Sequence, residues 1–334
     1  MADAKEQPRL GESALIKQYL APLCHPDMSF GLSDDAAFLN LESDHQLVLT
    51  KDMLVADVHF FADDAPELIA KKALRVNLSD LASKGAEPVG YLLGLGLPLD
   101  WTESWLKRFC AGLAEDQQTF NFPLIGGDTV KSPERLTLSI TAFGKVPKDL
   151  TILRRNASPD DDVYVTGTIG DSALGLLLRR EPEDYPDFGA KDGDVLINRF
   201  LLPQPRLQCR SLIRQFATAS MDISDGLMGD AAKMASAANC ALHLDDTAVP
   251  LSASAQAMLD VTAVSRDVAL TGGDDYELLF CARPQDRAAI LKAAAALDVP
   301  ITRIGRVAKG KGVCLLDGNG RELPLSKGVS YEHF

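Results

Sequence analysis

Residues 122–129 read FPLIGGDT, a short apolar strand that runs into two glycines, an aspartate and a threonine. Two adjacent glycines let the backbone approach a phosphate, and they expose amide groups that can bind it. The aspartate that follows could hold a metal ion. Taken alone, Gly-Gly-Asp is common in ordinary turns, and a turn is the simpler interpretation of this stretch. Whether this stretch marks a functional site depends on the other motifs in the chain.

Aspartates recur beside glycines and small residues at the ends of other strand-like segments. These are residues 31–35 (GLSDD), 50–52 (TKD), 221–226 (MDISDG) and 272–275 (GGDD). Carboxylates brought together raise each other's pKa and repel, so a fold that collects several in one cleft usually holds a divalent cation. Oxygen ligands with few His or Cys favour Mg²⁺ over zinc, and Mg²⁺ is typically bound together with substrate phosphates. The pattern therefore predicts phosphoryl transfer.

The composition is that of an ordinary enzyme. The chain has 334 residues, of which 46% are hydrophobic and 24% charged, and this length predicts about two domains. Its 34 basic and 47 acidic residues give a net charge of -13, which argues against binding a nucleic-acid backbone or an anionic membrane. Because the chain and a nucleotide are both negatively charged, we expect a nucleotide to bind only together with metal ions. No leader-like segment opens the chain and the most apolar segment, 89–98, is too short to span a bilayer, so we expect a cytoplasmic protein.

Helical and strand periodicities alternate along the chain, which predicts an α/β (α+β) fold of mixed layers. A long helix over 65–84 carries Asp80 near its end, where a solvated polar residue is as reasonable as a metal ligand. Residues 135–143 alternate as a strand, and 181–194 are predicted to be a loop. A composition shift at 145–162 predicts a boundary between an N-terminal domain, 1–148, and a C-terminal domain, 149–334.

The standard nucleotide-binding motifs are missing from the sequence. Residues 305–312 (GRVAKGKG) nearly match a phosphate-binding loop, but they lack the final Ser or Thr and precede a strand, so a β-turn is predicted. No GxGxxG opens a helix and no GxSxG is present. The six cysteines have no CxxC spacing, so zinc is not expected. Phosphates must be held in another way.

Several ordered blocks match a known family. They are 31–39 (GLSDDAAFL), 50–60 (TKDMLVADVHF), 72–88 (KALRVNLSDLASKGAEP), 124–129 (LIGGDT), 164–176 (YVTGTIGDSALGL), 221–227 (MDISDGL), 270–280 (LTGGDDYELLF) and 331–334 (YEHF). With them the chain resembles the thiamine-monophosphate kinase family. The superfamily also includes aminoimidazole ribonucleotide synthetase, selenophosphate synthetase and a hydrogenase maturation protein. His59 and the block at 272–277 point to the thiamine-phosphate branch.

The resemblance implies transfer of the ATP γ-phosphoryl group to thiamine monophosphate, giving thiamine diphosphate and ADP by direct in-line attack. No protein nucleophile is then needed, because the acceptor phosphate is already an oxyanion, and several Mg²⁺ ions neutralise charge on the transferring group. The implied fold is that of aminoimidazole ribonucleotide synthetase, with an N-terminal sheet that pairs with a second subunit in a homodimer and a C-terminal α/β domain.

The resemblance also assigns site residues, position by position. The implied metal ligands are Asp35, Thr50, Lys51, Asp52, Asp80, Asp128, Asp222 and Asp225. The implied ATP contacts are Gly127, Asp128, Arg154 and Ser224, with Arg155 as an alternative to Arg154. The implied substrate contacts are His59, Asp274 and Tyr331.

The family pattern is broken at several of these positions. Lys51 stands where a small hydroxyl residue is usual, Asp57 and Ser33 where Gly is usual, and Asp274 where Glu is usual. Two alternatives therefore remain open. One is another ATP-dependent enzyme of the same superfamily, and the other is a catalytically impaired nucleotide-binding or regulatory protein.

Overall fold

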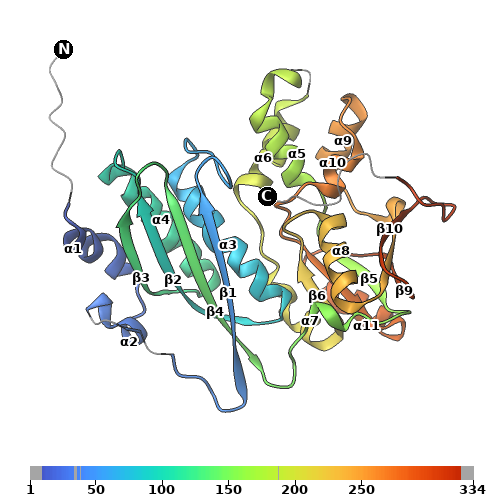
Figure 1. The fold of residues 1–334 in the computed structure, drawn as a ribbon, viewed down its shortest axis with the longest axis horizontal. Helices are drawn as coiled ribbons and strands as arrows, with labels where there is room; N and C mark the ends of the chain where they lie inside the picture. Colours follow the sequence, from blue (N-terminus) through green and yellow to red (C-terminus); the bar gives the residue numbers. More distant parts are fainter. Residues whose placement is uncertain (1–9, 34–35, 38, 187, 325–334) are drawn as a thin grey trace. The chain divides into compact units, whose positions relative to one another are not determined.

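The computed structural model describes residues 10–33, 36–37, 39–186 and 188–324 (Figure 1). The chain divides into two compact units. The first unit comprises Met1–Asn77 and Pro88–Lys145, and the second comprises Leu78–Glu87 and Val146–Phe334. Each unit contains one sheet with helices, which confirms the predicted mixed α/β class. Among the described residues, no helix has both the length and the apolar character needed to cross a membrane.

The first unit is built on a four-stranded sheet in the order β1-β4-β2-β3. The strands are β1 His45–Val55, β2 Glu87–Leu97, β3 Leu124–Lys131 and β4 Thr137–Pro147. Two helices, α3 Pro66–Ser83 and α4 Glu103–Phe120, lie against one face of this sheet (Figure 1). Short helical segments precede it: α1 Glu12–Leu15, a π-helical turn Ile16–Leu20, α2 Pro26–Ser29 and the 3₁₀ turns Ala21–Leu23 and Phe30–Leu32.

Side-chain alternation explains which face of the sheet the helices cover. In β4, Leu138 and Ile140 are fully buried, while Ser139 between them is only half-buried. Successive side chains of a strand point to opposite faces, so the strand predicted from the alternation over 135–143 is confirmed, and one of its faces is buried. The helices are joined by a buried ion pair, in which Arg75 Nε and Nη2 donate to the two carboxylate oxygens of Asp116 at 2.7 and 2.9 Å.

The second unit is built on a six-stranded sheet in the order β10-β7-β9-β5-β8-β6. The strands are β5 Asp162–Thr166, β6 Ala217–Asp222, β7 Ala241–Asp245, β8 Leu278–Ala282, β9 Ile301–Ala308 and β10 Gly312–Leu316. Strand pairs are antiparallel except for the parallel pair β10 and β7. Residues 309–311 connect β9 to β10. The segment 305–312, which nearly matches a phosphate-binding loop, therefore contains a turn between two strands, as predicted.

Two clusters of buried side chains hold the second unit together. In the larger one, α8 Leu227–Ala238 packs Leu227, Ala231 and Met234 against the sheet. The smaller one joins α5 Asp171–Arg180, α6 Ala190–Leu201, α9 Ala253–Val261 and α10 Arg266–Thr271. Two more helices, α7 Arg210–Phe216 and α11 Arg287–Ala294, also pack against each other.

Three of these helices differ from the sequence-based expectation. The predicted loop over 181–194 is wrong at its end, because α6 begins at Ala190. Helices α9 and α10 were not predicted, since the small residues of ASAQAMLDV give no clear apolar periodicity. Their caps were the available signal: the hydroxyl of Ser252 accepts from Ala255 N at 3.0 Å, and that of Ser265 accepts from Asp267 N at 3.3 Å.

Candidate functional site

The Gly-Gly-Asp stretch lies inside strand β3, not in a turn, so the turn interpretation is wrong. Gly127 pairs with Leu93 of β2 across a parallel ladder that contains a register shift. A Cβ added to Gly127 would lie 2.0 Å from the backbone oxygen of Leu93. Strand pairing therefore requires glycine here, whatever else this residue does. The carboxylate of the next residue, Asp128, is exposed and accepts from Thr129 N at 2.9 Å.

A depression of about 770 Å³ opens on the sheet face that α3 and α4 leave uncovered. Its lining includes three predicted site residues, Lys51, Gly127 and Asp128. We call it the first-unit depression. The ammonium of Lys51 donates to Ser139 Oγ on the adjacent strand β4. The structure thus brings part of the predicted metal and ATP set together within the first unit.

Strand alternation separates Lys51 from its two predicted partners. Lys51 is exposed on the same face of β1 as Leu49 and Met53, whereas Thr50 and Asp52 are half-buried on the other face. The cation that interrupts the family pattern therefore points away from the side chains of Thr50 and Asp52.

His59 follows β1 in a short turn. Its Nδ1 accepts a hydrogen bond from Val55 N at 3.1 Å, so in the neutral ring the proton is on Nε2. Asp57 in the same turn has φ 62°, a left-handed conformation that explains why glycine is usual at this position. The turn holds the His59 ring in a defined orientation.

A second depression, of about 690 Å³, collects four predicted site residues within the second unit. We call it the second-unit depression. Asp80 comes from the end of α3, Arg154 from the 3₁₀ turn Arg154–Asn156, Asp222 from the end of β6, and Ser224 from the loop before α8. Residues far apart in the sequence therefore meet here.

Burial perturbs the charged groups of the second-unit depression. Burial, followed by the nearby charge of Asp80, raises the pKa of Asp222 well above its usual value. Burial also lowers the pKa of Lys84, whose Nζ donates to Ser220 O at 2.6 Å. Two adjacent carboxylates, one of them almost fully buried, form a donor set that fits a hard divalent cation. Among the described residues, no three His, Cys, Asp or Glu side chains are close enough to hold a metal without other ligands.

The loop between β6 and α8 is fixed by Asp230, which was not predicted from the sequence. Its buried Oδ2 accepts from both Ser224 N and Asp225 N at 2.9 Å. Lys233, one helical turn later, donates to Asp230 Oδ1 at 2.8 Å and to the carboxylate of Asp225. Burial, as the largest effect, raises the pKa of Asp230. The spacing of Asp230 and Lys233 was the signal in the sequence.

The loop carrying Asp274 is hydrogen-bonded to the loop carrying Ser224. Asp274 N donates to Ser224 O, and Tyr276 N donates to Ile223 O, both at 2.8 Å. Asp274 and Tyr276 have positive φ values of 72° and 51°, and the Tyr276 hydroxyl donates to Asp274 Oδ1 at 3.2 Å. A predicted substrate contact and a predicted ATP contact are therefore held by directly bonded loops.

A buried ion network anchors the loop that carries Asp274 and Tyr276. The fully buried carboxylate of Glu277 accepts from Thr166 Oγ1 at 2.7 Å, Arg199 Nη2 at 2.8 Å and Arg206 Nε at 2.6 Å. Nearby, Asp275 Oδ2 accepts from Gly170 N at 2.8 Å. This anchoring was not foreseen, since its members come from distant parts of the sequence.

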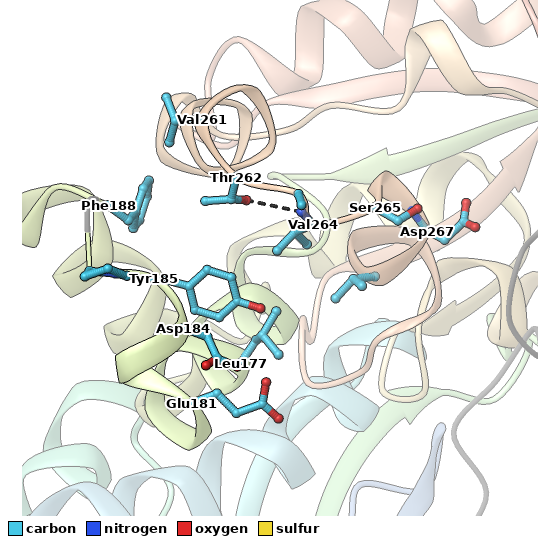
Figure 2. A pocket seen from close by; sticks show the side chains of 13 residues that line it. Leu177, Glu181, Asp184, Tyr185, Phe188, Val261, Thr262, Val264, Ser265 and Asp267 are labelled. Atoms are coloured by element: carbon cyan, nitrogen blue, oxygen red, sulfur yellow. Dashed lines mark hydrogen bonds between the residues drawn. The ribbon is translucent and has the colours of Figure 1, made fainter.

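A further depression of about 620 Å³ contains none of the predicted site residues (Figure 2). It lies between the segment carrying Tyr185 and Phe188 and the segment 261–268, with Glu181 and Asp184 beside the tyrosine ring. Thr262 Oγ1 accepts from Val264 N at 3.3 Å within the second segment. Two predicted site residues, Asp35 and Tyr331, lie outside the described residues.

Comparison with known proteins places the chain in a family. Residues 33–146 match the family "AIR synthase related protein, N-terminal domain", and residues 158–317 match the corresponding C-terminal domain. A thiamine-monophosphate kinase from Caulobacter vibrioides is 42% identical over 302 residues, which cover 89% of this chain and 84% of that protein. The chain belongs to the thiamine-monophosphate kinase family of AIR synthase related proteins.

Solved structures of the thiamine-monophosphate kinase family share the whole fold. The enzyme from Stenotrophomonas maltophilia K279a is 38% identical with a TM-score of 0.82, over 94% of this chain and 98% of that one. A structure described as AaThiL complexed with AMPPCP and TMP is 32% identical with a TM-score of 0.76, over 92% of this chain and 97% of that one. The resemblance inferred from the sequence blocks is confirmed.

Proposed function

We propose that this protein transfers the γ-phosphoryl group of ATP to thiamine monophosphate, giving thiamine diphosphate and ADP. The observation that carries the proposal is the near full-length similarity to proteins named thiamine-monophosphate kinase, one of them in complex with AMPPCP and TMP. The second-unit depression supports it, because side chains proposed to bind phosphate and side chains proposed to bind metal line it together. The cytoplasmic location predicted from the sequence accords with this activity.

The proposed mechanism needs no protein nucleophile. An oxygen of the acceptor phosphate attacks the γ-phosphorus in line, so the chain has to orient two phosphorylated substrates and exclude competing water. Arg154 is proposed to orient nucleotide phosphates, helped by the backbone around Ser224, whose position Asp230 fixes. His59 and Asp274 are proposed to orient thiamine monophosphate.

Mg²⁺ would supply charge neutralisation on the transferring group. In the second unit, Asp80, Asp222 and Asp225 are the proposed ligands. In the first unit the proposed ligands are Asp35, Thr50, Asp52 and Asp128, with Lys51 contributing through its backbone. Asp128 shares the first-unit depression with the Lys51 side chain, whereas Thr50 and Asp52 lie on the other face of β1, so Asp128 is proposed to serve a different ion from theirs. Oxygen atoms of the substrate phosphates would complete the ligand set, since Mg²⁺ usually combines a few carboxylates with substrate phosphates.

We also propose a homodimer formed through the open face of the first-unit sheet. Leu49 of β1, Met53 of β1 and Val130 of β3 are apolar, yet 54–58% exposed. Burying such side chains against a second copy removes apolar surface from water. Size-exclusion chromatography with light scattering tests this. The measured molar mass should be twice 36.0 kDa, and that of a Met53→Glu variant should shift towards the mass of the monomer.

The activity is tested by incubating purified protein with ATP, Mg²⁺ and either thiamine monophosphate or unphosphorylated thiamine. We expect thiamine diphosphate from the monophosphate only, and loss of product with Asp52→Asn. An Asp245→Asn variant provides the matched control, since Asp245 caps a 3₁₀ turn away from both depressions. Nucleotide binding without product from either acceptor would contradict the proposal.

A further inference from the structure

The second-unit depression gathers basic side chains in an otherwise acidic protein. Four basic side chains line it against three carboxylates: Lys84, Arg154, Arg155 and Lys233 against Asp80, Asp222 and Asp230. With Asp225, which forms an ion pair with Lys233, four basic side chains meet four carboxylates here, whereas the chain as a whole carries a net charge of -13. A surface that gathers cations attracts a polyanion directly.

The side chain of Lys84 is held in this depression by a hydrogen bond to a backbone carbonyl. It is half-buried, and its Nζ donates to Ser220 O, two residues before Asp222. An ammonium group has three donors, so this bond leaves capacity for other acceptors. A purely structural role, neutralising the neighbouring Asp222 and Asp80, is the simpler explanation. It does not account for the three other basic side chains that line the same depression.

Lys233 lies on the other side of the loop that carries Ser224. Its ammonium contacts Asp230 and Asp225, and its side chain is 37% exposed, so it is accessible from the depression. Asp230 also holds Ser224 N and Asp225 N, so the loop is kept in place by bonds that do not involve Lys233. The lysine can therefore exchange one carboxylate for a phosphate oxygen while the loop stays fixed.

We propose that Lys84 and Lys233 bind the nucleotide phosphates directly, so that this depression holds a nucleoside polyphosphate even when no divalent cation is present. The inference rests on the proposed function, since it says how the nucleotide of that reaction is anchored. Lysine acts on phosphate as a compact point charge, and Arg154 and Arg155 add planar donors. The divalent cation then matters for the transfer step more than for anchoring.

Calorimetric titration of ADP into the full-length protein in excess EDTA tests the inference. Wild-type protein should bind ADP under these conditions. Lys233→Met and Lys84→Met should each weaken binding about fivefold or more, as loss of a charge-assisted contact to phosphate does. Lys233→Arg, which keeps the cation, should bind nearly as well as wild type. Lys311→Met, at an exposed position outside the depression, should bind as wild type.

Two results would overturn the inference. One is wild-type protein that binds ADP with Mg²⁺ but not in EDTA, and the other is a folded Lys233→Met variant with unchanged affinity in EDTA. Circular dichroism establishes that each variant is folded, and Lys233→Met decides the outcome if the more buried Lys84→Met does not fold. Binding in EDTA without any thiamine diphosphate production would contradict the proposed function and leave this inference standing.

Discussion

Arg206→Met should strongly destabilise the second unit. Arg206 donates from Nε and Nη2 to both carboxylate oxygens of Glu277, which is fully buried. Removing one partner of a buried ion pair typically costs about 3–5 kcal/mol, because the other charge is left without compensation. Glu277 keeps its bonds from Arg199 and Thr166, so we expect a loss of about 3 kcal/mol.

The first unit offers a matched control with the same geometry at the surface. Arg108 donates from Nε and Nη2 to the carboxylate of Glu67 at 2.7 and 2.8 Å, but both side chains are substantially exposed. Water screens this pair, so Arg108→Met should change the free energy of unfolding far less than Arg206→Met. Urea unfolding followed by circular dichroism measures both. Equal losses in the two variants would show that pairing geometry, and not burial, sets the cost of removing the arginine.

Three further substitutions test other parts of the structure. Gly127→Ala should cost about 1–3 kcal/mol in thermal unfolding, because its Cβ would meet the Leu93 carbonyl at 2.0 Å; unchanged stability would contradict that packing. Burial raises the pKa of Asp275, so this residue contributes stability below its unfolded pKa of about 3.9, and that contribution is lost as pH rises through the higher folded pKa. Asp275→Asn stays neutral, so its free energy of unfolding should decline less from pH 4 to 8, and a decline equal to that of wild type would contradict the assignment. Tyr276→Phe removes the hydroxyl that bonds Asp274 and should raise KM for thiamine monophosphate about fivefold with kcat nearly unchanged; a fall in kcat alone would argue against this positioning role.

Periodicity and composition predicted much of the fold. The alternation over 135–143 identified strand β4, one face of which is buried. Helices α9 and α10 could not be found this way, because small residues give little apolar contrast and packing against α5 and α6 stabilises them. The order of the strands in each sheet could not be predicted from the sequence either, since it depends on contacts between distant segments.

The candidate site was only partly predictable. The family resemblance assigned Asp80, Asp222 and Ser224 to the site, and the structure brings these three residues to one depression. The supporting residues were missed because their roles depend on tertiary contacts: Asp230 acts through two backbone amides, and Glu277 through two arginines. The Gly-Gly-Asp stretch was misjudged as a turn for a similar reason, since only the neighbouring strand shows why glycine is needed.

Phosphorus NMR of ATP and thiamine monophosphate, in the presence of the purified protein and Mg²⁺, shows directly whether the protein transfers the phosphoryl group between them. We expect the γ-phosphoryl group of ATP to be transferred to thiamine monophosphate, with thiamine diphosphate and ADP appearing in equal amounts. Conversion of ATP to ADP and inorganic phosphate, with thiamine monophosphate unchanged, would contradict the proposed function.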